Sequence, residues 1–238
     1  MFGIIKKIRK FIKYRKIHGS SAAKIQYLRS KGVKIGNGCQ IFSPKEIQID
    51  ITRPELVEIG DNVFLHKGTT ILTHDWCSWC FVNSHKTFIP SHGKVKIGNN
   101  VWFGENVSVC KGVTIGDNCI IGIGSIVTKS IPSNSVAVGV PARVVCTYEE
   151  YFEKRKKQFV DEAVEYAKTI IDSGREPEIA DFYDDYPAFV DGSNYHLYNY
   201  PYQRVFKNEQ DFEVWKQTYK APFDGFDQFM KYVKEQHK

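Results

Sequence analysis

Residues 95–127 read VKIGNNVWFGENVSVCKGVTIGDNCIIGIGSIV. Apolar side chains recur every six positions along this stretch, at Ile97, Phe103, Val109, Ile115, Ile121 and Val127. A small or β-branched residue stands two positions before each of them, and glycine or asparagine stands three positions before most of them. The same unit recurs upstream at Ile35, Ile41 and Ile47, and again at Ile59, Leu65 and Ile71.

The six-residue period decides the fold class. Residues two apart in a strand share a face, so each apolar pair points into a core. Glycine and asparagine tolerate left-handed backbone angles and let the chain turn sharply. Three short strands and three turns then close a triangular coil, and stacked coils bury a continuous apolar column. The sequence therefore predicts a mainly β protein built on a parallel β-helix of hexapeptide repeats, although the period does not fix its hand.

The period also predicts how the chain is organised. We expect a basic N-terminal helical segment over residues 1–32, the β-helix over 33–146, and a helical, aromatic-rich extension over 147–238. A loop over residues 75–94 interrupts the β-helix. A loop that leaves a rigid scaffold is a common place for a functional site.

Charge is concentrated at the N-terminus. Residues 1–18 contain seven Lys and Arg and no Asp or Glu, whereas the net charge of the whole chain is only +6. This distribution argues against a general nucleic-acid-binding protein. The segment is predicted to be a basic amphipathic helix, which could lie on an anionic membrane surface or dock on its own protein. No secretory signal or spanning apolar run is visible, so a cytoplasmic protein is expected.

Several motifs resemble the hexapeptide-repeat acyltransferases. They are GKVKIGNNVWFG (93–104), GIGSIVTK (122–129), the following IP (131–132) and GVPAR (139–143). LTHD (72–75), which precedes a Ser-Trp pair, is similar to the branch that O-acetylates capsular or other surface polysaccharides. The resemblance implies a left-handed coil, acetyl-CoA as donor, and a homotrimer with active sites between neighbouring subunits.

The resemblance also implies roles for residues near the loop. His74 would be the general base, because an imidazole can take a proton from a hydroxyl at neutral pH. Asp75 would orient the ring or bind the acceptor. Trp76 and Trp79 would stack on a sugar, or else simply fasten the loop.

A second set of residues would hold the donor. The backbone N–H of Glu105 would stabilise the oxyanion, and that of Ile123 would contact the pantetheine arm. Lys129 and Arg143 would lie near the CoA phosphates, although each could also be an ordinary surface charge. Trp102 would wall the donor site or pack in a subunit interface. The predicted donor set is Trp102, Gly104, Glu105, Gly122, Ile123, Lys129 and Arg143.

Cys77 and Cys80 complete a His-x2-Cys-x2-Cys spacing with His74. Structural zinc usually takes four ligands from two spaced pairs, and no second pair exists, so no metal is expected. A redox pair is the other alternative. We favour two loop-packing cysteines.

These observations predict an O-acetyltransferase that acts directly on a hydroxyl of a surface saccharide, either free or lipid-linked. The alternatives are an N-acetyltransferase of a sugar nucleotide, a small-molecule acetyltransferase, a zinc-dependent lyase of the carbonic-anhydrase type, and an inactive structural trimer. Beyond the β-helix we expect helices over 148–172, 210–218 and 225–235. The aromatic, acidic segment 176–202 is predicted to be an extended wrap over its own or a neighbouring subunit.

Overall fold

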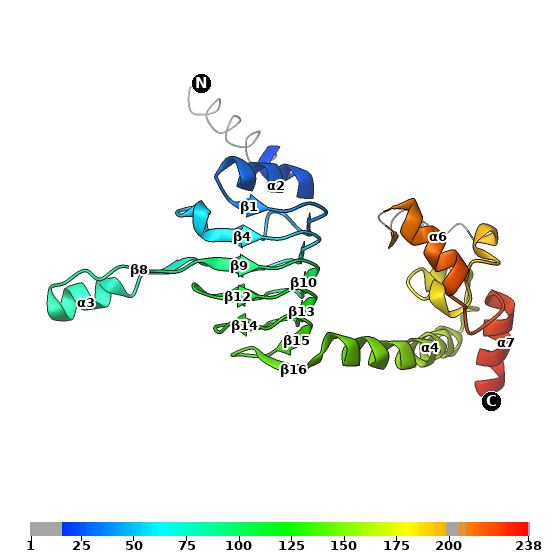
Figure 1. The fold of residues 1–238 in the computed structure, drawn as a ribbon. Coiled ribbons are helices and arrows are strands. Elements are labelled where there is room, and N and C mark those ends of the chain that lie inside the picture. Colours follow the sequence, from blue (N-terminus) through cyan, green and yellow to red (C-terminus); the bar gives the residue numbers. More distant parts are fainter. Residues whose placement is uncertain (1–15, 199–204, 207, 238) are drawn as a thin grey trace, which may run out of the picture. The chain divides into compact units, whose positions relative to one another are not determined.

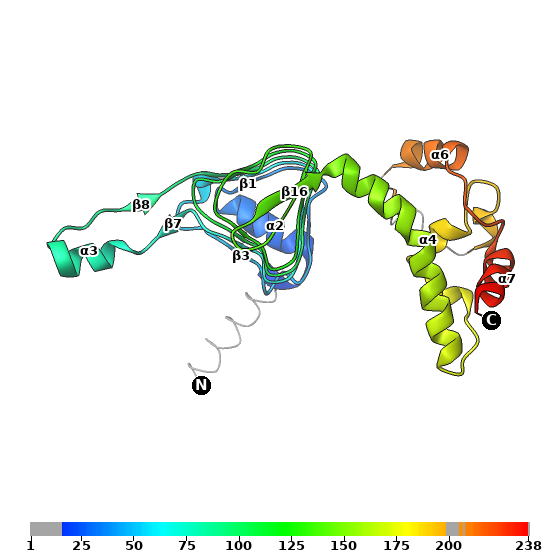
Figure 2. The same ribbon diagram turned by 90° about the horizontal axis from the view of Figure 1, so that it is seen from below.

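The computed structural model describes residues 16–198, 205–206 and 208–237. The chain divides into two compact units, residues 1–151 and 152–238. The first unit is a stack of coils whose cross-section Figure 2 shows end-on. Its coil strands are β1 (Lys34–Ile35), β2 (Gln40–Ile41), β3 (Gln48–Ile49), β4 (Val57–Ile59), β5 (Phe64–Leu65), β6 (Thr70–Ile71), β9 (Val95–Ile97), β10 (Val101–Phe103), β11 (Ser108–Val109), β12 (Thr114–Ile115), β13 (Cys119–Ile121), β14 (Ile126–Val127), β15 (Ser135–Val138) and β16 (Arg143–Thr147).

These strands form three sheets, one on each side of the coil (Figure 1). Sheet A has the order β1-β4-β9-β12, sheet B the order β2-β5-β10-β13-β15-β16, and sheet C the order β3-β6-β11-β14. Neighbouring strands are parallel, except that β16 runs antiparallel to β15 and ends the stack. The predicted parallel β-helix is confirmed.

The predicted core and turn residues occupy the expected places. The six apolar residues of the 97–127 period are each at most 1% exposed. Asn100, Asn106 and Asn118 have left-handed backbone angles, with φ of 53°, 58° and 52°. Asparagine reaches this region at a smaller cost than most residues, so it can turn each corner.

One position of the predicted period is wrong. β3 pairs with β6 so that Ile49, not Ile47, lies beside Ile71. The corner before β3 (residues 42–47) is longer than the matching corner before β6 (residues 66–69) and includes Ser43, whose φ is 53°. Ile47 is still buried, because it takes the inward place two residues earlier. This shift has a consequence for the site, since it also moves Asp50.

The predicted loop contains regular structure. The arm, defined as residues 74–92, consists of β7 (His74–Asp75), α3 (Ser78–His85) and β8 (Ser91–His92). β7 and β8 pair antiparallel and form its root, and Figure 1 shows α3 at its far end. The turn η1 (Pro54–Leu56) lies in the connection between β3 and β4, where the six-residue period is also interrupted.

The helix α2 (Ser21–Ser30) precedes the first coil, and the Ser20 hydroxyl caps its start by accepting a hydrogen bond from the N–H of Ala23. Its Ile25 and Leu28 belong to the β-helix core. The predicted basic helix falls mainly on residues 1–15, which lie outside the described residues. In the described part of the chain, no helix combines the length and apolarity needed to cross a bilayer.

The second unit has a core of its own. Its helices are α4 (Tyr148–Asp172, which starts at the end of the first unit), α6 (Glu209–Thr218), α7 (Phe226–Gln236) and the short turns η2 (Ile179–Phe182), η3 (Tyr186–Ala188) and η4 (Tyr195–Leu197). Phe182, Phe189 and Phe229 are fully buried and contact one another. The predicted segment packs on its own chain but is not extended: its described residues form short turns, and most of their aromatic side chains pack inside this unit.

Candidate active site

His74 lies where the chain leaves the coils to enter the arm. It is the first residue of β7, and it follows the fully buried Thr73. Its side chain is 14% exposed, so the imidazole is held by the protein yet remains within reach of a small molecule.

The carboxylate of Asp50, a residue that the sequence prediction omits, holds this imidazole. Its Oδ2 atom lies 2.6 Å from Nδ1 of His74. Asp50 follows β3, and the pairing of Ile49 with Ile71 brings it beside the chain just before His74. The sequence signal that could have revealed Asp50 is a charged residue directly after an apolar strand, because a buried carboxylate needs hydrogen-bond donors.

Further hydrogen bonds surround the Asp50 carboxylate. Its Oδ1 accepts from the N–H of Thr52 (2.8 Å) and from the Thr52 hydroxyl (2.7 Å). Its Oδ2 accepts from the N–H of Thr73 (3.2 Å) and from the Thr73 hydroxyl. Burial raises the pKa of Asp50, but the hydrogen bonds from Thr73, Thr52 and His74 outweigh burial and hold the pKa well below its usual range. Asp50 is therefore ionised at neutral pH.

The ionised carboxylate selects one form of the neutral imidazole. Because a carboxylate only accepts hydrogen bonds, Nδ1 of His74 must donate. Nε2 then keeps its lone pair. Among the residues that the structure describes, none is hydrogen-bonded to Nε2. This arrangement can take a proton from a hydroxyl that approaches Nε2.

Asp75 does not orient the imidazole, contrary to one of its two predicted roles. Its Oδ2 accepts hydrogen bonds from Nζ of Lys111 and from the Ser91 hydroxyl (3.0 Å). Its Oδ1 accepts from the N–H of Cys77 (3.2 Å). Asp75 therefore lies at the arm root, on the side of Lys111 and Ser91.

The two predicted acceptor tryptophans are both on the arm and both exposed, Trp76 by 62% and Trp79 by 58%. The Trp76 ring meets the His74 ring edge-on, with 5.3 Å between centroids and 89° between planes. The Trp79 ring contacts Phe88, also on the arm, with centroids 6.1 Å apart. Only Trp76 of the two therefore contacts His74.

The predicted donor residues meet at another corner, after sheet B. Gly104 follows β10 and Gly122 follows β13, and the N–H of Gly104 donates to the carbonyl of Ile121 (2.8 Å). A Cβ on Gly104 would lie 2.5 Å from the backbone N of Ile123, and one on Gly122 would lie 2.6 Å from Val138 Cγ1. Glycine is thus required at Gly104, where the backbone of the next coil leaves no room, whereas a side chain at Gly122 would have to displace the Val138 side chain.

Backbone donors are available at this corner. Within the described residues, neither the N–H of Glu105 nor that of Ile123 donates a hydrogen bond to a protein group. The Ile123 side chain is 71% exposed. Two N–H groups without a protein acceptor at one corner can donate hydrogen bonds to the carbonyl oxygens of a ligand.

Trp102 is the outward-facing residue of β10, on sheet B. Its register partners are Phe64 and Ile120, and its side chain is 41% exposed. The His66 ring packs between those of Trp102 (5.0 Å) and Phe42 (4.4 Å). Burial lowers the pKa of His66 more than the nearby Glu105 raises it.

The predicted phosphate contacts are divided between the two corners. Arg143 starts β16 and pairs with Val138, near Gly122. Lys129 follows β14 of sheet C and therefore shares the corner of His74. Both side chains are exposed.

The predicted site residues consequently fall into two groups. The corner after sheet C contains His74, Asp75, Trp76 and Lys129. The corner after sheet B and the strands that adjoin it contain Trp102, Gly104, Glu105, Gly122, Ile123 and Arg143. Sheet C lies between the two corners. A single chain therefore does not bring the imidazole to the predicted donor residues.

Cys77 and Cys80 are free and exposed. The pKa of the Cys77 thiol is raised mainly by its hydrogen bond to Asp75, and desolvation raises this pKa further. Within residues 16–198, 205–206 and 208–237, no group of three or more His, Cys, Asp and Glu side chains is placed to hold a metal ion.

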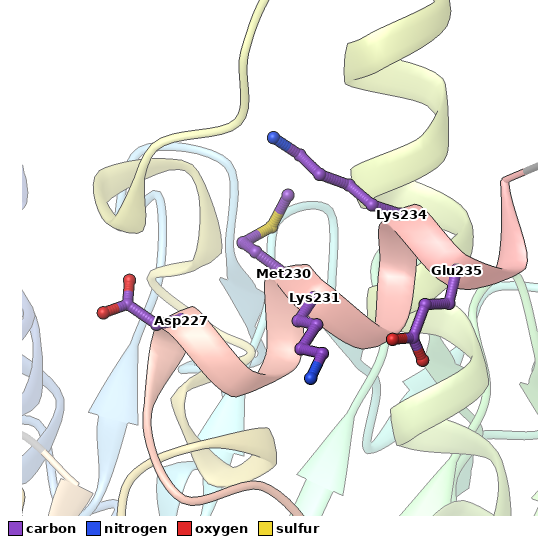
Figure 3. Close-up of a pocket in the computed structure, with 5 residues that line it drawn as sticks. All are labelled: Asp227, Met230, Lys231, Lys234 and Glu235. Atoms are coloured by element: carbon purple, nitrogen blue, oxygen red, sulfur yellow. The ribbon is translucent and has the colours of Figure 1, made fainter.

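The second unit has a surface depression on α7 (Figure 3). Its lining residues are Asp227, Met230, Lys231, Lys234 and Glu235. All of them come from one helix, and the Lys231 and Lys234 side chains point in different directions in Figure 3. None is a predicted site residue.

Comparisons with known proteins agree with the hexapeptide pattern. The family described as bacterial transferase hexapeptide (six repeats) matches residues 94–129. Protein CapG of Staphylococcus aureus is 34% identical over 127 residues, which cover 53% of this chain and 73% of CapG. The chain belongs to the hexapeptide-repeat acyltransferase family.

Other members of the hexapeptide-repeat acyltransferases match over shorter parts. Galactoside O-acetyltransferase of Escherichia coli K12 is 47% identical over 91 residues, which cover 37% of this chain and 43% of that protein. The putative acetyltransferase YvoF of Bacillus subtilis 168 is 34% identical over 45% of this chain and 58% of its own length. The chain thus spans about half the length of these two relatives.

Among solved structures, a maltose O-acetyltransferase from Clostridium difficile 630 is 31% identical, with a TM-score of 0.40, over 60% of this chain and 88% of that one. A galactoside acetyltransferase in complex with coenzyme A is also 31% identical, with a TM-score of 0.42, over 58% of this chain and 78% of that one.

Proposed function

We propose that this protein is an acetyl-CoA-dependent O-acetyltransferase that acts on a hydroxyl of a surface saccharide. The observation that carries the proposal is the His74–Asp50 pair, which leaves Nε2 of the imidazole available in a chain of this family. Two of the matched proteins are named for O-acetyl transfer to sugars, galactoside and maltose.

The proposed reaction is a direct transfer. Nε2 of His74 takes the proton of the acceptor hydroxyl as its oxygen attacks the thioester carbonyl of acetyl-CoA. Asp50 stabilises the imidazolium that forms, because its carboxylate already faces Nδ1. The oxyanion of the tetrahedral intermediate accepts a hydrogen bond from the N–H of Glu105. The carbon–sulfur bond then breaks, and the imidazolium returns its proton to the CoA sulfur.

The separation of the two corners supports a site shared between chains. In a homotrimer of left-handed β-helices, the His74 corner of one subunit would face the Gly104–Gly122 corner of the next. Lys129 from the first corner and Arg143 from the second would then approach the CoA phosphates from two subunits. The partly exposed column of Phe64, Trp102 and Ile120 supports an interface on sheet B.

The remaining parts of the proposal concern the acceptor. If the saccharide is attached to a lipid carrier, binding of the basic residues 1–18 to the inner, cytoplasmic face of the membrane would bring the enzyme to its acceptor. Asp75, Trp76 and Trp79 are the predicted acceptor residues, and Trp76 is the one that contacts His74.

Thiol release from acetyl-CoA tests the proposed reaction, with p-nitrophenyl β-galactoside as the acceptor. We expect release of CoA that depends on the acceptor, and an acetylated product that neutral hydroxylamine cleaves, because hydroxylamine attacks esters faster than amides. A hydroxylamine-resistant product from an amino sugar would favour N-acetylation instead. Absence of thiol release with a panel of hydroxyl and amino sugars would reject an acetyltransferase.

A further inference from the structure

Lys111 lies outside the machinery proposed above, yet it contacts the root of the arm. It follows β11 at the corner after sheet C, one coil beyond the corner where the chain leaves for the arm. Its Nζ donates to Oδ2 of Asp75 and to the hydroxyl of Ser91. Asp75 and Ser91 are register partners in β7 and β8, so one ammonium group joins both strands of the root to the coils.

Few other contacts hold the root. β7 and β8 are two residues long, and the N–H of Gly93 donates to the carbonyl of Thr73 (2.8 Å). A two-stranded ribbon of this length has little stability alone, so its direction depends on what it is attached to. The Lys111 and Asp75 side chains are 31% and 39% exposed, so water only partly screens their interaction.

The root carries the residues nearest the imidazole. His74 and Asp75 form β7, and Trp76 follows directly with its ring against the His74 ring. His74 itself is fixed independently by Asp50. A shift of Asp75, Ser91 and the arm beyond them would therefore displace Trp76, while the Asp50 carboxylate still holds the His74 imidazole.

We propose that Lys111 is a positioning residue for acceptor binding: through Asp75 and Ser91 it fixes the arm so that Trp76 forms one wall of the acceptor site beside His74. This inference rests on the proposed function and concerns a saccharide acceptor. Under this proposal Asp75 contacts Lys111 inside the protein and does not contact the acceptor directly.

The test compares Lys111→Met with Lys111→Arg and with a matched control, Lys34→Met. Lys34 forms an ion pair with Glu58 (2.8 Å) on sheet A, and Glu58 keeps a second partner, Lys94, when Lys34 is changed. For Lys111→Met we expect the KM for p-nitrophenyl β-galactoside to rise about tenfold, with kcat and the KM for acetyl-CoA within about twofold. Lys111→Arg should recover most of the acceptor affinity, and Lys34→Met should behave as the wild type.

Hydrogen–deuterium exchange provides a readout that does not need turnover. Amides of residues 73–77 and 91–93 should exchange faster in Lys111→Met and Asp75→Asn, and the double variant should add little to either. Unchanged exchange in Lys111→Met, or faster exchange with an unchanged acceptor KM, would overturn the positioning role. A larger rise of acceptor KM in Asp75→Asn than in Lys111→Met would also overturn it, because it would indicate direct contact between Asp75 and the acceptor.

The two proposals fail in different ways. A wild-type chain that releases no CoA thiol with any acceptor would reject the proposed function, and the acceptor role of Lys111 with it. An active wild type with an indifferent Lys111→Met would reject the positioning role alone.

Discussion

Replacing His74 with alanine will lower kcat for acetyl transfer by about 10³-fold, because the acceptor hydroxyl loses its general base. Affinity for CoA should stay within about twofold, since the predicted donor residues other than Lys129 lie at the other corner of the chain and Lys129 is unchanged. Steady-state kinetics with p-nitrophenyl β-galactoside, together with calorimetry of CoA binding, measure the two effects.

His92→Ala is the matched control for this experiment. His92 lies opposite His74 in the β7–β8 pair and is exposed. Its removal should leave kcat within about twofold, because it has no part in the proposed proton transfer. A His74→Ala chain that keeps more than a tenth of wild-type kcat would contradict the role of His74.

Asp50→Asn is expected to lower kcat by about 10²-fold, although the side chain keeps its size. Every group that contacts the Asp50 carboxylate is a donor: the N–H and hydroxyl groups of Thr52 and Thr73, and Nδ1 of His74. An asparagine must turn its NH₂ group toward at least one of these donors. If it faces His74, Nδ1 becomes the acceptor and Nε2 carries the proton, which is the wrong form for a base.

Asp61→Asn controls for the change from carboxylate to amide. Asp61 accepts a hydrogen bond from the N–H of Asn37 (2.6 Å), and Asn99 has the corresponding place in the next coil, where its side chain accepts from the N–H of Asp61 (2.8 Å). The fold therefore already accommodates asparagine at this kind of corner. Urea unfolding first shows that both variants are folded, and steady-state kinetics then compares their kcat values. A kcat of Asp50→Asn within about threefold of wild type would refute the positioning of His74 by Asp50.

The sequence predicts the coils because their information is local. Each inward residue and each left-handed corner repeats within one hexad, so Phe103 and Asn106 can be placed without knowing what lies above or below them. The helix over Tyr148–Asp172 follows in the same way from its own periodicity. Ile47 was misplaced because a longer corner shifts the register, and only pairing with Ile71 in the next coil reveals the shift.

The site needed information from farther away. Asp50 and His74 belong to successive coils, and no local pattern pairs an acidic residue with a histidine across them. Asp75 is next to His74 in sequence, yet β-strand geometry sends adjacent side chains to opposite sides, which places Asp75 beside Lys111. The helix α3 is short, and Cys77 at its start makes no side-chain capping hydrogen bond, so the sequence has no clear signal for it.

In the proposed homotrimer, each active site joins the His74 corner of one subunit to the donor corner of the next. Two variants separate the corners: His74→Ala lacks the base, and Ile123→Trp fills the donor corner at a position that is 71% exposed and tolerant of size. Calorimetry should first show that Ile123→Trp no longer binds CoA.

Subunit mixing then measures the claim directly. The two inactive chains are unfolded together in equal amounts and refolded. Every mixed trimer should contain one site with an intact base from one chain and an intact donor corner from the other, so about a quarter of wild-type activity should return. Activity no higher than that of the two separate variants would contradict a site shared between chains.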